Sequence, residues 1–98
     1  MTVVEFVQFK LKKGSSEKEF LAISDKFQKE YLEKRKGYMS RTLSLNGDKW
    51  LDIVVWASME EAKAAMEAAY NAPEFQAFGS IIDEENCSAE HYTVIRND

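Results

Sequence analysis

Hydrophobic and polar positions along the chain predict four strands. Residues 2–11 carry β-branched and aromatic side chains on both faces of an extended segment, which predicts a central strand. Residues 38–56 predict a hairpin, and residues 87–96 predict the last strand. One face of the first strand holds Val3, Val7, Phe9 and Leu11, and the other holds Val4 and Phe6.

Two serines mark the predicted starts of the main helices. Ser16 is followed by Glu19, and Ser58 by Glu61, which is the capping-box spacing that satisfies free backbone N–H groups. The first helix is expected to run to about Lys36 and the second to about Tyr70, with a short third helix opened by Pro73. The buried stripe of the first helix is predicted as Phe20, Ile23, Phe27 and Tyr31.

The dipeptide Asn46-Gly47 lies at the centre of the hairpin. Asn-Gly is typical of a two-residue type I′ turn, and this turn would place Arg41 directly opposite Asp52. The two apolar faces of the next strand differ: one holds a triplet expected to face the core, and the other holds two tryptophans. The triplet expected to face the core is Leu51, Ile53 and Val55, and the opposite face holds Trp50, Val54 and Trp56.

The order strand, helix, strand, strand, helix, strand predicts an α+β fold. Right-handed crossovers turn it into one ferredoxin-like domain over residues 1–98, with an antiparallel sheet and helices on one face. The second sheet face would then be bare although it is apolar. We therefore expect a homodimer that packs sheet face on sheet face.

The composition of the chain limits the kinds of partner and the cellular location that we expect. The net charge is −4 and the basic residues are scattered, which argues against a nucleic-acid partner. The longest wholly apolar run covers residues 53–57, so no membrane association is expected. The single cysteine, Cys87, and the lack of a signal peptide favour a cytoplasmic location.

Polar candidates for chemistry are few. His91 is the one side chain whose ordinary pKa suits proton transfer near neutral pH, although a lone histidine on a strand is more often a structural residue. Arg41 is either a structural partner of Asp52 or a hydrogen-bond donor to a ligand. No second histidine supports a metal site, so neither a metal nor a cofactor is expected.

Three stretches resemble the antibiotic-biosynthesis-monooxygenase-like domains of the dimeric α/β-barrel superfamily. They are Gly37-Tyr38, the segment DIVVWASMEEAKAA (52–65) and the segment APEFQAF (72–78). The superfamily includes cofactor-independent oxygenases, haem-degrading enzymes and members without known activity. The haem-degrading branch carries an iron-ligating histidine where this chain has Phe78 or Gly79, which argues against haem.

The resemblance implies one of two functions. The first is a cofactor-independent monooxygenase of a small electron-rich aromatic compound, with His91 as proton acceptor and Trp56 or Arg41 shaping the pocket. The second is a non-catalytic small-molecule-binding or stress-responsive protein in which Trp56 serves as packing. Aromatic residues that could line a pocket between the sheet and the helices, or else belong to the core, are Tyr38, Tyr70, Phe75, Phe78 and Tyr92. The ligand itself is expected between the sheet and the second helix, near Tyr70, Phe75 and Phe78.

Overall fold

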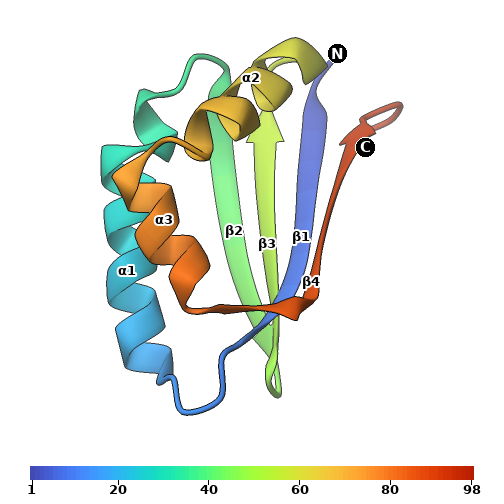
Figure 1. The fold of residues 1–98 in the computed structure, drawn as a ribbon. Coiled ribbons are helices and arrows are strands. Elements are labelled where there is room, and N and C mark those ends of the chain that lie inside the picture. The colour runs from blue at the N-terminus through green and yellow to red at the C-terminus, as the bar shows by residue number, and fades with distance from the viewer.

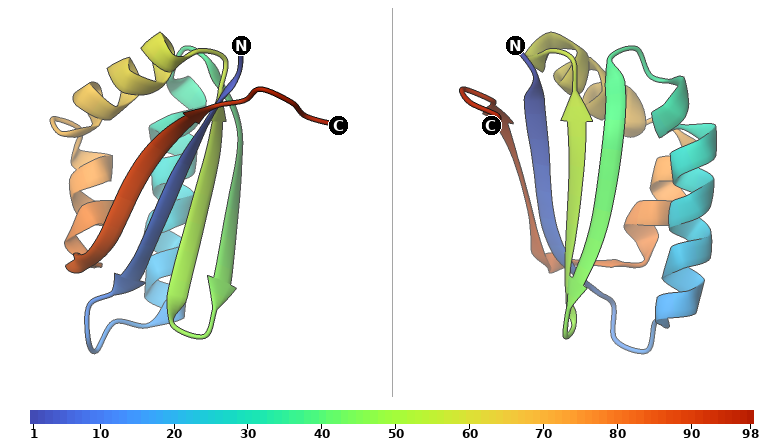
Figure 2. Two further views of the ribbon diagram at one scale, coloured as in Figure 1. Left: turned by 90° about the vertical axis from the view of Figure 1, so that its right-hand side faces the viewer. Right: turned by 180° about the vertical axis from the view of Figure 1, so that it is seen from behind.

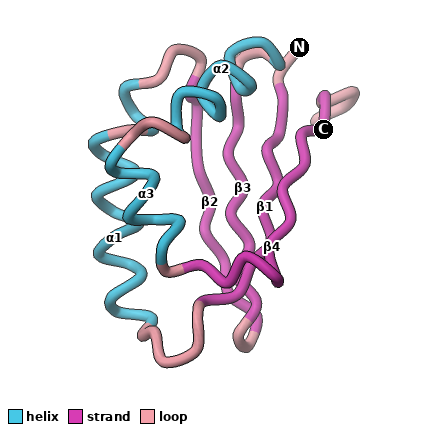
Figure 3. Tube along the Cα trace, in the orientation of Figure 1, coloured by secondary structure: helices cyan, strands magenta, loops and turns pink.

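The computed structural model describes residues 1–98 as a four-stranded antiparallel sheet with three α-helices gathered on one face (Figures 1 and 3). The strand order β2-β3-β1-β4 places the first strand in the interior of the sheet and confirms the predicted ferredoxin-like topology. The elements are β1 (Val3–Leu11), α1 (Glu17–Glu30), a 3₁₀ turn η1 (Leu32–Lys34), β2 (Tyr38–Asn46), β3 (Lys49–Trp56), α2 (Met59–Ala69), α3 (Pro73–Ser80) and β4 (Ile82–Thr93).

Both predicted capping serines start their helices. The hydroxyl of Ser16 accepts a hydrogen bond from the Glu19 amide at 3.0 Å, and that of Ser58 accepts one from the Glu61 amide at 3.1 Å. The first helix ends at Glu30, six residues before the predicted end near Lys36. Tyr31 leaves helical geometry there, and the chain tightens into η1, which buries Leu32.

The hairpin register differs by two residues from the prediction. Asn46 pairs with Lys49, so the loop is Gly47-Asp48, and Arg41 lies opposite Val54 rather than Asp52. Gly47 has a φ of 65°, and no residue other than glycine has a positive φ. A glycine at the first loop position is the requirement of a type II′ turn, whereas the predicted type I′ turn would have needed Asn46 in the left-handed region.

The face of β3 that meets the helices is also the reverse of the prediction. Trp50, Val54 and Trp56 are buried beneath the helices, together with Asp52. The triplet Leu51, Ile53 and Val55 is only part-buried and lies on the opposite, uncovered face. Figure 2 shows that face of the sheet with no helix packed on it. The shift of two residues in the hairpin preserved which residues share a face, because side chains alternate with a period of two.

The last strand begins earlier than predicted. β4 starts at Ile82 rather than at Cys87, and its pairing with β1 shifts between Phe9 and Leu11. Polar residues occupy its first half, which hid this part of the strand from the hydrophobic pattern. From Cys87 to Thr93, β4 runs in regular antiparallel register with β1 and brings His91 opposite Glu5.

A cluster of aromatic rings fills the space between α1, α3 and the lower part of the sheet. Phe20 packs against Phe9, Trp50 and Phe78, with ring centroids 4.7–5.5 Å apart. This cluster holds α1 and α3 on the sheet. None of the helices has both the length and the apolar composition needed to cross a membrane.

Candidate functional site

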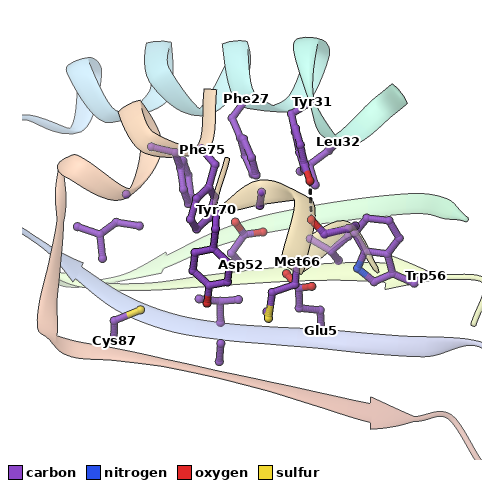
Figure 4. Close-up of a pocket in the computed structure, with 18 of the residues that line it drawn as sticks. Glu5, Phe27, Tyr31, Leu32, Asp52, Trp56, Met66, Tyr70, Phe75 and Cys87 are labelled. Carbon is purple, nitrogen blue, oxygen red and sulfur yellow. Dashed lines mark hydrogen bonds between the residues drawn. The ribbon is translucent and has the colours of Figure 1, made fainter. Parts of the chain in front are cut away.

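A cavity of about 410 Å³ lies between the helices and the sheet (Figure 4). Fifteen of its nineteen lining residues are hydrophobic, and they come from both α1 and α2, from α3 and from three strands. The hydroxyl of Tyr31 donates a hydrogen bond to the backbone oxygen of Ala65, which ties the end of α1 to α2 beside the cavity. A mainly apolar cavity of this size, with a few polar groups, is typical of a small-molecule site.

The charged groups of the cavity lie on its sheet side. Glu5 on β1 pairs with Val54 on β3, so that Asp52 and Trp56 are its diagonal neighbours on the same sheet face. All three side chains line the cavity. Figure 4 shows the two carboxylates and the indole on the strands beneath α1. Register alone therefore places two acids and one N–H donor side by side.

Glu5 is held by the histidine of the neighbouring strand. His91 Nε2 lies 3.1 Å from Glu5 Oε1, and the two side chains are 14% and 15% exposed. Burial raises the pKa of Glu5 above its ordinary value of 4.5, although the nearby His91 partly offsets this effect. A carboxyl group with a raised pKa beside an imidazole is a pair suited to taking up a proton.

Asp52 is neutralised by Arg41. The guanidinium donates from Nε to Oδ1 at 2.9 Å and from Nη2 to Oδ2 at 2.8 Å, so the pair is bidentate. Each side chain is only 6% exposed. The Arg41 guanidinium also lies 5.6 Å from the ring centre of Phe78 and 5.8 Å from that of Phe27. Asp52 is therefore a fixed part of the cavity wall, held from behind by Arg41.

Trp56 contributes a donor without a partner. The residue is 1% exposed, and its buried indole Nε1 makes no well-formed hydrogen bond within the protein, although it lies close enough to Glu5 to lower the pKa of that carboxyl group. An unpartnered buried N–H is unfavourable unless a ligand or water supplies an acceptor. The indole lines the cavity, so a bound molecule can supply that acceptor.

The residues singled out in the sequence fall into three groups. Trp56, Tyr70, Phe75 and Phe78 line the cavity. His91 and Arg41 lie behind the carboxylates that line it. Tyr38 packs edge-on against Trp56 outside the lining, and Tyr92 lies on the other sheet face against Phe6. Tyr92 is placed there because it pairs with Val4, one residue out of phase with His91, which pairs with Glu5 and shares its sheet face.

Sequence reasoning missed Glu5 as a site residue. The available signal was an acid in the middle of an apolar strand expected to be central, where an unpaired carboxylate is unfavourable. Its partner could not be identified without the β1–β4 register.

No group of three potential metal ligands converges anywhere in the structure. Cys87 lies at the rim of the cavity, and burial raises the pKa of its thiol.

Solved structures share this fold at low sequence identity. SnoaB from Streptomyces nogalater, a cofactor-independent oxygenase, superposes with a TM-score of 0.80 and 14% identity over 98% of this chain and 95% of its own. A monooxygenase from the gene ActVA-Orf6 of Streptomyces coelicolor, in complex with nanaomycin D, superposes with a TM-score of 0.70 and 16% identity over 98% of this chain and 89% of its own. A conserved protein from Methanosarcina mazei Go1 superposes with a TM-score of 0.71 and 12% identity over 94% of this chain and 91% of its own.

The resemblance to antibiotic-biosynthesis-monooxygenase-like domains is thus confirmed at the level of the fold. No protein-family model matches the chain, and no curated protein matches it in sequence.

Proposed function

We propose that the protein is a cofactor-independent monooxygenase that acts on a small electron-rich aromatic compound. The observation that carries this proposal is the apolar cavity with the Glu5–His91 pair at its wall. The shared fold with a cofactor-independent oxygenase supports it. A ligand complex of another protein of this fold, with nanaomycin D, supports an aromatic ligand.

The chemistry requires little from the protein. A substrate with an activated CH₂ group loses one proton and becomes a carbanion that can transfer electrons to dioxygen. The C–O bond then forms, the O–O bond breaks, and the CH₂ group becomes a carbonyl while the second oxygen atom leaves as water. The substrate supplies all the electrons, so the protein needs a proton acceptor, orientation and exclusion of bulk water. We assign the temporary acceptor of the first proton to His91, behind Glu5; both hydrogens of the CH₂ group end in the departing water, so His91 returns its proton at that step.

Oxygen uptake with anthrone-like compounds and quinols tests this function. Wild-type protein should consume oxygen above the uncatalysed rate, and His91→Ala should lower the rate by about 10²-fold or more, as expected for loss of an acid–base group. His91→Gln keeps a hydrogen-bonding group beside Glu5 but cannot take up the proton, so it should be equally slow. Background rates for wild type across the whole panel would reject the enzyme and favour a non-catalytic binding protein.

We further propose that the protein works in the cytoplasm as a homodimer. The uncovered sheet face carries five part-buried apolar side chains and no helix. Burial of such an apolar face against a second copy of the chain is favourable. The side chains are Val4, Phe6, Leu51, Ile53 and Val55.

A further inference from the structure

The charged side chains that line the cavity directly are all acidic, and their cationic partners lie behind them. The lining includes three acids and no lysine, arginine or histidine. Glu5 and Asp52 lie on the interior strands β1 and β3, and Glu84 is exposed on the edge strand β4. Arg41 balances the charge of Asp52 from behind, so an anionic ligand would chiefly meet the Glu5 carboxyl group, with no cation of the lining facing it. In a weakly polar surrounding that arrangement is strongly unfavourable.

The two buried carboxylates are not equivalent toward a ligand. Both oxygens of Asp52 accept hydrogen bonds from Arg41, so its charge and acceptors are already engaged. The hydrogen bond between Glu5 and His91 uses only Oε1. The second oxygen of Glu5 makes no well-formed hydrogen bond in the protein, and its nearest donor is the Trp56 indole, so a ligand hydroxyl group can insert between these two groups. Both groups lie on the same sheet face.

We propose that Glu5 determines the specificity of the cavity: it accepts a hydrogen bond from an aromatic hydroxyl group and rejects aromatic carboxylates. A hydroxyl group can donate to Glu5 and accept from Trp56 Nε1 at the same time, which satisfies both protein groups. A carboxylate can accept from Trp56 but repels Glu5. This inference rests on the proposed aromatic ligand, yet it concerns selectivity and not turnover.

Matched binding measurements on one ring system test this selectivity. The dissociation constants of 1-naphthol, 1-naphthoate and naphthalene are measured by calorimetry at neutral pH, where naphthol is uncharged and naphthoate is ionised. We expect naphthol to bind about 10-fold or more tightly than naphthoate, with naphthalene between them. Glu5→Gln, which keeps the shape and removes the charge, should reduce the naphthol-to-naphthoate ratio by about 10-fold.

Glu67→Gln is the matched control, because Glu67 is exposed on α2 and does not line the cavity. Its naphthol-to-naphthoate ratio should equal that of the wild type. Naphthoate binding as tightly as naphthol, or a ratio unchanged in Glu5→Gln, would overturn the assignment of Glu5. Selective naphthol binding, together with background oxygen uptake across the anthrone and quinol panel, would support the assignment while rejecting the monooxygenase. Failure of all three compounds to bind would overturn the assignment of Glu5, while the oxygen-uptake panel still decides on the monooxygenase.

Discussion

Arg41→Met should destabilise the protein by about 3–5 kcal/mol, a large part of the stability of a typical small domain. The substitution leaves Asp52 in a site where its side chain is 6% exposed and has lost two charge-assisted hydrogen bonds. Methionine keeps most of the apolar contact that the Arg41 stem makes, so the effect reports on the charge. Urea unfolding, followed by circular dichroism, measures the change in the free energy of unfolding.

The double variant Arg41→Met with Asp52→Leu supplies the control. It removes both charges from the wall, and replacing a buried ion pair by apolar side chains is often neutral or stabilising. The double variant should therefore recover most of the stability lost in the single one. A single variant within about 1 kcal/mol of the wild type would show that the pair behaves like an exposed salt bridge. Arg41 would then not be needed to hold the Asp52 carboxylate in the cavity wall.

Ile53→Asp should convert a dimer into a monomer. Ile53 lies at the middle of the uncovered face, and a carboxylate there would be buried without a partner if a second sheet covered it. Multi-angle light scattering at micromolar concentration should give twice the chain mass of 11.3 kDa for the wild type and the single mass for the variant. Circular dichroism should show that the variant stays folded.

Ala64→Asp is the control for this experiment, because Ala64 is exposed on α2, away from the uncovered sheet face. It should leave the mass unchanged. A monomeric wild type, or an Ile53→Asp variant that stays dimeric, would contradict the proposed interface. Val54→Asp cannot serve the same purpose, because Val54 is 2% exposed beneath the helices and its substitution would disturb the core.

The sequence predicts the elements of this fold well because their signals are local. Ser16 and Ser58 cap helices through residues three positions away, and Pro73 opens α3 at its first turn. The covered face of β3 could not be predicted in the same way. Both of its faces are apolar, and a period of two separates the faces without telling which one the helices cover.

The candidate site was only partly predictable, because its polar groups meet through strand register. The Arg41–Asp52 contact was found although the register was displaced by two residues, because a long arginine side chain also reaches a diagonal neighbour. The Glu5–His91 contact joins residues that are 86 positions apart. No local pattern connects them, and only the pairing of the first strand with the last brings them together.

The two tryptophans of the chain allow the most direct test of the cavity as the ligand site. Trp56 lines it with an unpartnered indole N–H, whereas Trp50 is packed between Phe9 and Phe20 outside it. A ¹H–¹⁵N spectrum recorded during titration with 1-naphthol reports both indole N–H groups at once, and Trp50→Phe assigns them. We expect the Trp56 signal to shift until saturation while the Trp50 signal stays in place. An unmoved Trp56 signal at saturating ligand, or a shift of Trp50 alone, would contradict binding in this cavity.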